Sequence, residues 1–229
     1  MLAPQLAAEG HEAVLDRVYR RQRYVYDFTR KYYLFGRDRL IRELDLRPGQ
    51  RLIEIGSGTA RNLIAVARRY PGTELYGLDA SLEMLKTAKP AIDRAGLGGR
   101  VSLAHGLAED LDPALFGGGR PFDRVVFSYS LSMIPQWKQA VNRASMVLAA
   151  GGRIHVVDFG DFTGLGRPGA ALLQAWLRFF HVQPRVELLH AIESANGATA
   201  RKSADLWILP GRYAFGWRGS SQDAVDLPF

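Results

Sequence analysis

The arrangement of apolar and polar positions changes character near residue 51. Between residues 17 and 35, apolar and aromatic residues recur at helical spacing and most charged residues fall on the other side of the helical wheel. This pattern predicts a basic amphipathic helix. From Arg51 onward, short β-rich apolar runs alternate with longer amphipathic stretches. Such alternation is typical of a parallel sheet with crossover helices.

The apolar runs predict five strands, at 51–55, 74–79, 101–106, 123–128 and 153–159. The stretches between them predict helices at 61–69, 81–95 and 136–148, and Gly151-Gly152 predicts the turn into the fifth strand. Beyond these, 170–180 is expected to be helical, and 206–208 with 213–217 to form a closing hairpin across Pro210-Gly211. We therefore predict an α/β domain at 49–219 with a mostly parallel, seven-stranded sheet, a helical segment covering it at 1–48, and a tail at 220–229.

Composition narrows the class of protein. The chain has 229 residues, 47% of them hydrophobic, which suits one well-buried domain. It has no cysteine, which excludes disulfides, zinc-thiolate sites and a cysteine nucleophile. No stretch reaches the roughly 18 apolar residues of a membrane span, so neither a signal peptide nor a transmembrane helix is expected. The histidines show no metal-ligand spacing with nearby carboxylates, and no metal is predicted.

The net charge of +7 is concentrated in one segment. Residues 17 to 42 hold nine arginines and lysines against two aspartates, and the rest of the chain is balanced. A local basic patch predicts an anionic partner. The alternative interpretation is an ordinary solvated helix face.

A Gly-x-Gly turn lies between the first predicted strand and its helix, at Glu54-Ile55-Gly56-Ser57-Gly58-Thr59-Ala60. Glycines at such a turn let the backbone approach a ligand closely. A phosphate loop would need Gly-Lys-Ser/Thr, which is missing, and a dinucleotide loop would keep a third glycine near Arg61. Asp79, at the end of the second strand, offers a carboxylate to a ribose, as both NAD and S-adenosylmethionine (SAM) sites require. The alternative is a glycine-rich turn without a ligand.

Four ordered motifs resemble those of class I SAM-dependent methyltransferases. They are Glu54-x-Gly56-x-Gly58-Thr59, Gly77-Leu78-Asp79-Ala80-Ser81-x-x-Met84, Gly106-Leu107-Ala108-Glu109-Asp110-Leu111 and Phe122-Asp123-Arg124-Val125-Val126. The resemblance implies a Rossmann-like fold with N-terminal covering helices. It also implies that Gly56, Ser57 and Gly58 pass under the methionine part of SAM, that Asp79 holds the ribose, and that Ala80, Met84, Ala108 and Glu109 surround the adenine. Tyr26, Glu54 and Ser128 complete the predicted cofactor-binding set.

The methyl acceptor has to be inferred separately, because this fold serves many acceptors. The Asp/Asn-Pro-Pro-Tyr motif that holds a base is missing, since the fourth strand ends in Ser128-Tyr129-Ser130-Leu131, and without cysteine the covalent route to C5 of cytosine is closed. No nucleic acid is therefore expected. A basic amphipathic helix beside the cofactor can instead lie on an anionic bilayer and let a lipid headgroup reach the methyl donor.

Two further stretches, at 19–41 and 127–135, resemble the bacterial betaine-lipid enzymes that N-methylate diacylglycerylhomoserine. The resemblance implies three successive methyl transfers, giving diacylglyceryl-trimethylhomoserine. It also implies a cytoplasmic protein peripheral to the inner face of the membrane. Phosphatidylethanolamine or a soluble metabolite remains an alternative acceptor. An RNA-binding protein that retains a SAM pocket without catalysis is the alternative from another class.

Methylation of an amine needs few catalytic groups, because a neutral amine held in line with the S–CH3 bond is already a nucleophile. Tyr129, Asp158 and Tyr33 are the candidates for contacting the amine or relaying its proton; Tyr33 has the alternative role of a core aromatic. His155, inside the fifth strand, is interpreted as a packed side chain. Trp176, Phe179 and Phe180 with Arg178 form either a second membrane-facing element or a buried helix.

Overall fold

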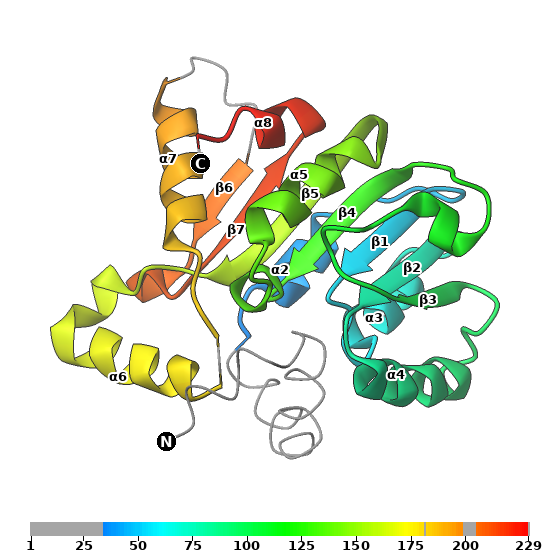
Figure 1. Cartoon of the computed structure of the whole chain (residues 1–229), viewed down its shortest axis with the longest axis horizontal. Helices are drawn as coiled ribbons and strands as arrows, with labels where there is room; N and C mark the ends of the chain where they lie inside the picture. Colours follow the sequence, from blue (N-terminus) through cyan, green and yellow to red (C-terminus); the bar gives the residue numbers. More distant parts are fainter. Residues whose placement is uncertain (1–33, 181, 199–204, 229) are drawn as a thin grey trace.

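The structure, a computed structural model, describes residues 34–180, 182–198 and 205–228 (Figure 1). The predicted amphipathic helix lies almost entirely outside these residues. The same is true of Tyr26 and Tyr33, and of the cofactor and catalytic roles predicted for them.

The core of the molecule is one seven-stranded sheet with the order β3-β2-β1-β4-β5-β7-β6 (Figure 1). The strands β1 to β5 pair in parallel, and β7 runs antiparallel to both β5 and β6. Their bounds are β1 Arg51–Ile55, β2 Glu74–Asp79, β3 Val101–His105, β4 Phe122–Ser128, β5 Leu148–Phe159, β6 Asp205–Ile208 and β7 Ala214–Gly219. The predicted sheet and its closing hairpin are confirmed. The strand order reverses between β1 and β4, and at such a point the carboxyl ends of parallel strands leave a crevice for a ligand.

Helices cover both faces of the sheet (Figure 1). One face carries α2, α3, α4 and α6, and the other carries α5, α7 and α8. The bounds are α2 Arg37–Arg42, α3 Arg61–Arg69, α4 Leu82–Arg94, α5 Trp137–Met146, α6 Gly166–Phe179, α7 Val186–Ala198 and α8 Ser221–Val225. Short 3-10 turns lie at η1 Pro113–Phe116, η2 Leu131–Met133, η3 Thr163–Leu165 and η4 Pro210–Arg212.

Strand β1 is buried along its whole length because both sides of it are covered. Leu52 packs with Leu63 of α3 in one apolar cluster. Its neighbour Ile53 points to the opposite face and packs in the cluster that contains Val141 of α5. This double burial fixes β1 in the centre of the sheet, so the loop that follows it starts from a rigid support.

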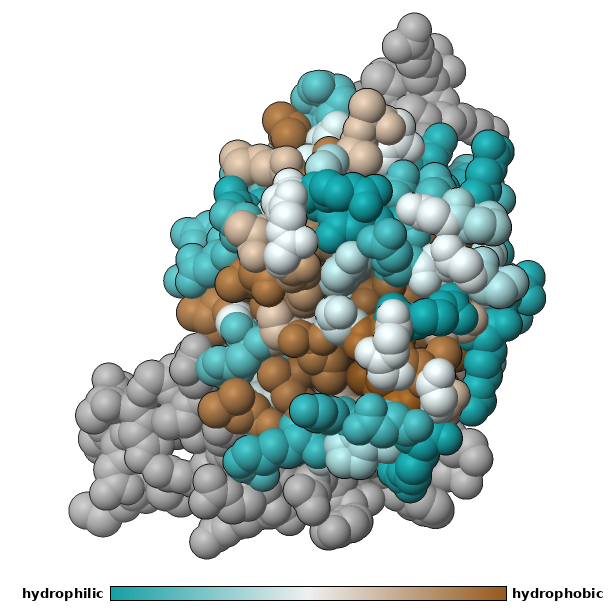
Figure 2. Space-filling model, turned by 90° about the vertical axis from the view of Figure 1, so that its right-hand side faces the viewer, coloured by the Kyte–Doolittle hydropathy of each residue, from teal (hydrophilic) through white to brown (hydrophobic). Residues whose placement is uncertain are grey.

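The sheet ends at β3, which pairs with β2 alone. Figure 2 looks at this side of the molecule, where apolar residues gather in the middle of the face between bands of hydrophilic ones. Leu103 and Ala104 of β3 are only partly buried there. In the described part of the chain, no helix is long and apolar enough to cross a bilayer.

Three features of the fold correct the sequence interpretation. The described part of the predicted tail, residues 220–228, is not loose, because Ser220 and Asp223 form a capping box that starts α8, and Leu227 is buried against the α5 face. Helix α7 was not predicted, and in the structure its Leu188, Leu189, Ala191 and Ile192 are buried on one side against the sheet. Strand β5 begins at Leu148, five residues early, and absorbs Gly151-Gly152 in a register shift against β4.

Candidate active site

The glycine loop leaves β1 at the crevice and turns sharply into α3. Gly56 and Gly58 have positive φ values of 73° and 53°. A Cβ on Gly56 would lie 2.5 Å from the Cβ of Ser130, so the loop backbone and the segment after β4 approach closely only because Gly56 has no side chain. Ala60, two residues after Gly58, also has a positive φ of 60°, a conformation that costs an alanine about 1–2 kcal/mol.

Asp79 holds the loop and the end of β2 together. Its Oδ2 accepts a hydrogen bond from the Gly58 N–H at 2.7 Å, and its Oδ1 accepts one from the Ser81 N–H at 2.9 Å. Ser81 in turn caps α4, because its hydroxyl oxygen accepts from the Met84 N–H at 3.3 Å. The Asp79 carboxylate is thus fixed in place while remaining partly exposed in the crevice.

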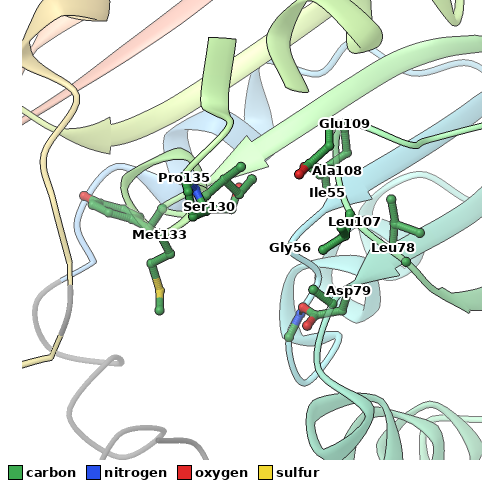
Figure 3. A pocket seen from close by; sticks show the side chains of 15 residues that line it. Ile55, Gly56, Leu78, Asp79, Leu107, Ala108, Glu109, Ser130, Met133 and Pro135 are labelled. Carbon is green, nitrogen blue, oxygen red and sulfur yellow. Dashed lines mark hydrogen bonds between the residues drawn. The ribbon is translucent and has the colours of Figure 1, made fainter. Parts of the chain in front are cut away.

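A cavity of about 630 Å³, open to solvent, lies between the loop and η2 (Figure 3). On one side it is lined by Gly56, Gly58, Asp79, Ala80, Ala108 and Glu109. The other side, called here the η2 wall, consists of Tyr129, Ser130, Met133, Ile134 and Pro135. Figure 3 shows Asp79 and Glu109 across the cavity from Ser130 and Met133.

A second cavity, of about 670 Å³, lies on the other side of the same loop. The predicted residues Glu54, Gly56, Ser57, Gly58 and Ser128 line it, and Leu34, Arg37, Thr59, Arg61 and Asn62 complete it. Asn62 donates a hydrogen bond to Glu54 Oε1 at 2.7 Å. Arg37 and Arg61 supply positive charge to this compartment. Neither is among the predicted site residues: in the sequence Arg37 stands out only as part of the basic segment, and Arg61 only as the residue at the place of a glycine.

The two cavities share Gly56 and Gly58, so they form adjoining compartments around one loop. Within the described residues, all but one of the predicted cofactor-binding residues line one compartment or the other. The exception is Met84, which is 1% exposed and packs beneath the rim with Met133 and Phe180. Its side chain supports the cavity instead of lining it.

Tyr129 combines a strained backbone with a buried ring. Its φ is 56°, unusual for an aromatic residue and a conformation that clusters at functional sites. The hydroxyl donates to the Phe35 carbonyl oxygen at 2.6 Å, and the ring packs edge-on against Phe159 with centroids 4.7 Å apart. Burial, with Tyr213 and Asp158 nearby, raises the pKa of Tyr129 well above 10. The residue is therefore a neutral phenol whose proton is already engaged.

Asp158 lies behind the η2 wall and lines neither cavity. It is completely buried; its Oδ2 accepts from the Ser132 N–H at 3.0 Å and its Oδ1 from the Phe159 N–H at 2.8 Å. Burial raises the pKa of its carboxyl from 3.8 to about 6, although these hydrogen bonds pull it down. Asp158 therefore contacts the site indirectly, by fixing the backbone of Ser132 in the η2 segment.

The η2 segment is held from a second direction by residues that the sequence analysis did not identify. Arg185 donates from Nε to the Leu131 carbonyl oxygen at 3.0 Å and from Nη2 to the Ile134 carbonyl oxygen at 2.7 Å. The Gln183 N–H donates to the Ser132 carbonyl oxygen at 2.8 Å. Three successive parts of the segment are therefore fixed by the chain between α6 and α7.

The remaining ionisable candidate, His155, is 2% exposed inside β5. Burial and the neighbouring Arg124, Arg218 and Arg153 lower its pKa to about 3, so it is neutral near pH 7. This placement agrees with a packed side chain. Across residues 34–180, 182–198 and 205–228, no three His, Asp or Glu side chains lie close enough to hold a metal ion.

Comparison with known proteins identifies this arrangement. A family described as a methyltransferase domain matches residues 52–152, the segment that carries the loop, the whole lining of the first cavity and the lining of the second except Leu34 and Arg37. Residues 52–152 therefore form a SAM-dependent methyltransferase domain, and the fold is that of class I enzymes. The methyl donor of this methyltransferase is SAM, and the bare backbone at Gly56, the fixed Asp79 carboxylate and the two adjoining compartments fit such a molecule.

Individual relatives differ in the acceptor named for them. The methyltransferase is 30% identical over 168 residues to the ubiquinone/menaquinone biosynthesis C-methyltransferase UbiE of Syntrophotalea carbinolica, covering 70% of this chain and 66% of that one. It is 30% identical over 173 residues to the demethylspheroidene O-methyltransferase of Cereibacter sphaeroides, covering 75% and 44%. The match thus spans less than two thirds of either relative. The solved SAM-dependent methyltransferase SibL shares the fold, with a TM-score of 0.60 at 22% identity over 88% of this chain and 57% of that one.

The close approach at Gly56 yields a first prediction. Gly56→Ala should weaken SAM binding at least tenfold, because the new Cβ meets Ser130 and pushes the loop away from the η2 wall. Gly49→Ala is the matched control, since Gly49 has a φ of 82° but open space around it. That control should lose only about 1 kcal/mol of stability and keep its SAM affinity. Calorimetric titration with SAM measures both, and equal affinities in the two variants would refute the close approach.

A second prediction follows from the buried carboxyl of Asp158. Its pKa is raised in the folded state, so its contribution to the free energy of unfolding is present at low pH and is lost as the pH rises through about 6. The stability of the wild type relative to Asp158→Asn should therefore fall by roughly 1–2 kcal/mol between pH 5 and pH 7.5. Urea unfolding of both proteins at the two pH values tests this. A difference that stays constant would mean that the carboxyl titrates normally.

Proposed function

We propose that this methyltransferase transfers methyl groups from SAM to the amine of a lipid headgroup, with diacylglycerylhomoserine as the acceptor and its trimethylated betaine lipid as the product. Two observations support this. The stretches that resemble betaine-lipid enzymes include Leu34 and Arg37 beside one compartment and the whole η2 wall of the other. The η2 wall also contains no lysine, histidine or carboxylate.

The cofactor is proposed to bridge the two compartments across Gly56 and Gly58. Its adenosine part would lie between Asp79, Ala80, Ala108 and Glu109, where a carboxylate is positioned for ribose hydroxyls. Its methionine part would lie in the polar compartment, where Arg37 and Arg61 complement a carboxylate. When bound, SAM would supply an electrophilic methyl group to the acceptor.

The composition of the η2 wall favours an amine over an alcohol or a carbon atom as the acceptor. A hydroxyl or ring carbon usually needs a base to become nucleophilic, whereas a neutral amine carries its own lone pair. In the described part of the cavity the only ionisable group on the wall is Tyr129, whose raised pKa keeps it protonated. We infer that the wall acts by positioning the amine and excluding water, and that the amine releases its proton to solvent.

Tyr129 is proposed to act through its ring. An aromatic face stabilises a methylated ammonium by cation–π attraction, and that cation becomes less hydrated with every methyl group added. The strained backbone at Tyr129 and the hydrogen bond to Phe35 hold the ring in the wall. A positioning role of this kind needs the ring but not the hydroxyl.

A quinone ring carbon is the second candidate acceptor, because the Syntrophotalea relative is named as a quinone C-methyltransferase. The two candidates are separated by supplying labelled SAM with vesicles that contain diacylglycerylhomoserine, phosphatidylethanolamine or demethylmenaquinone. The proposal predicts label in diacylglycerylhomoserine, with mono-, di- and trimethylated products. Label in the quinone alone would overturn it. Label in phosphatidylethanolamine alone would keep N-methylation and change the headgroup.

The role of Tyr129 gives a third prediction. Tyr129→Phe keeps the ring and should retain kcat within about threefold, losing only about 1 kcal/mol of stability with the hydrogen bond to Phe35. Tyr129→Leu has the same backbone strain but no ring, and should raise KM for the acceptor several-fold. Steady-state methylation of the labelled lipid measures both variants. A drop of a hundredfold or more in Tyr129→Phe would instead identify the hydroxyl as a proton-transfer group.

A further inference from the structure

Helix α6 presents an apolar side to solvent. Leu172 is 75% exposed and Phe179 is 69% exposed, and Leu165, just before the helix, is 40% exposed. Leu172 and Phe179 are spaced seven apart, which is two helical turns, so they lie one above the other on the outer side of the helix. We call Leu172 and Phe179 the α6 stripe. Large apolar side chains lined up on a surface commonly mark a binding face.

The opposite side of α6 is anchored to the protein. Leu177 is buried, and Ala170, Leu173, Trp176 and Phe180 pack against the apolar cluster of the α2–α3 face. The stripe is therefore not the packed side of a displaced helix. It is a second apolar side on a helix that already has its place in the core.

The charges around the stripe are basic. Helix α6 contains Arg167 near its start and Arg178 near its end, both exposed, and it has no aspartate or glutamate. The nearest preceding carboxylate, Asp161, is paired with Arg212 at 2.8 Å. An apolar line flanked by arginines matches the interface of an anionic bilayer, with acyl chains beneath and phosphates at the level of the guanidinium groups.

The position of α6 relative to the active site suits a lipid acceptor. At the carboxyl end of the helix, Phe180 packs against Met84, as does Met133 of the η2 wall. Gln183, three residues after Phe180 in the sequence, donates its N–H to the Ser132 carbonyl oxygen at 2.8 Å. Beside this turn lies an additional mainly apolar cavity of about 580 Å³, lined by Phe162, Gln174, Arg178, Val182, Pro184 and Val186. The stripe and the wall are thus joined by continuous, packed structure.

We propose that α6 is a membrane-docking helix whose stripe enters the interface of an anionic bilayer, with the rim of the active site held beside the headgroups. This deepens the proposed lipid methylation and rests on it for its purpose. The surface itself is defined independently by the exposure, spacing and charge of α6.

The test uses the full-length protein and sedimentation with vesicles of phosphatidylglycerol and phosphatidylcholine or of phosphatidylcholine alone. The wild type should bind the anionic vesicles more tightly. The double variant Leu172→Asp, Phe179→Asp should bind them at least tenfold more weakly, because two apolar anchors become charges that the bilayer repels. SAM affinity should be unchanged, since neither side chain is part of the lining of the two compartments at the glycine loop.

The matched control is Met146→Asp, Val225→Asp. Met146 is 64% exposed and Val225 is 59% exposed, but they belong to α5 and α8 on the other face of the sheet. This variant should bind vesicles like the wild type. Equal binding by the α6 variant would overturn the proposal and assign the membrane contact to the basic segment 17–42. The proposal would also be overturned by a wild type that binds no vesicles. It would be overturned as well if analytical ultracentrifugation showed that the wild type dimerises and that the α6 variant does not.

A second readout separates docking from chemistry. With a short-chain, water-soluble diacylglycerylhomoserine, the α6 variant should methylate as fast as the wild type, whereas with the long-chain lipid in vesicles it should be at least tenfold slower. Equal rates on the long-chain lipid would contradict the docking role. If the wild type binds vesicles through α6 but methylates neither lipid, docking stands and the proposed acceptor fails.

Discussion

The close approach of Gly56 to Ser130 is the constraint on which both compartments depend. It brings the loop after β1 against the segment after β4, at the point where the strand order of the sheet reverses. Because Gly56 has no side chain, the backbone of the loop lies directly against Ser130. The loop thereby divides the crevice into two compartments, one with the apolar η2 wall and one with a polar lining. A side chain at Gly56 would push the loop away from Ser130, and the two compartments would then merge or close.

Such an approach is useful only if both partners are rigid. The loop side is fixed by Asp79, whose two carboxylate oxygens accept from the Gly58 and Ser81 N–H groups. The η2 side is fixed by groups outside the cavity: Asp158 from β5 and Arg185 from the chain before α7. A fully buried carboxylate is costly, and here it supports the wall of the site through the backbone of Ser132. Positioning of this precision is what the proposed methylation of an amine, which uses no strong base, requires.

Sequence reasoning found the features that are local in the chain. The β1 turn and Asp79 are set by spacing within a strand–turn–helix unit, and the strands by their apolar runs, so these predictions needed no knowledge of distant contacts. Arg185 was missed because its partners, Leu131 and Ile134, lie about fifty residues away and are carbonyl groups that leave no sequence signal. Met84 follows the family motif, yet the face of α4 it occupies turns it under the rim. That orientation depends on how the helix packs, which spacing alone does not determine.

Polar groups are distributed unequally between the side of the cavity that would hold the methyl donor and the side that would hold the methyl acceptor. The methyl donor would be recognised by backbone and carboxylate groups that are fixed in position. Few other ligands could form hydrogen bonds with all of these groups at once. The η2 wall offers mainly shape, an aromatic ring and apolar side chains, which many acceptors could fit. Selectivity for a lipid would then come from where the enzyme sits as well as from what the cavity contacts. An amphiphilic acceptor concentrated in a bilayer reaches a site whose rim adjoins a surface helix far more often than the same acceptor dispersed in water. If α6 docks on a membrane, its apolar stripe would supply the preference for a lipid acceptor that the contacts in the cavity do not provide.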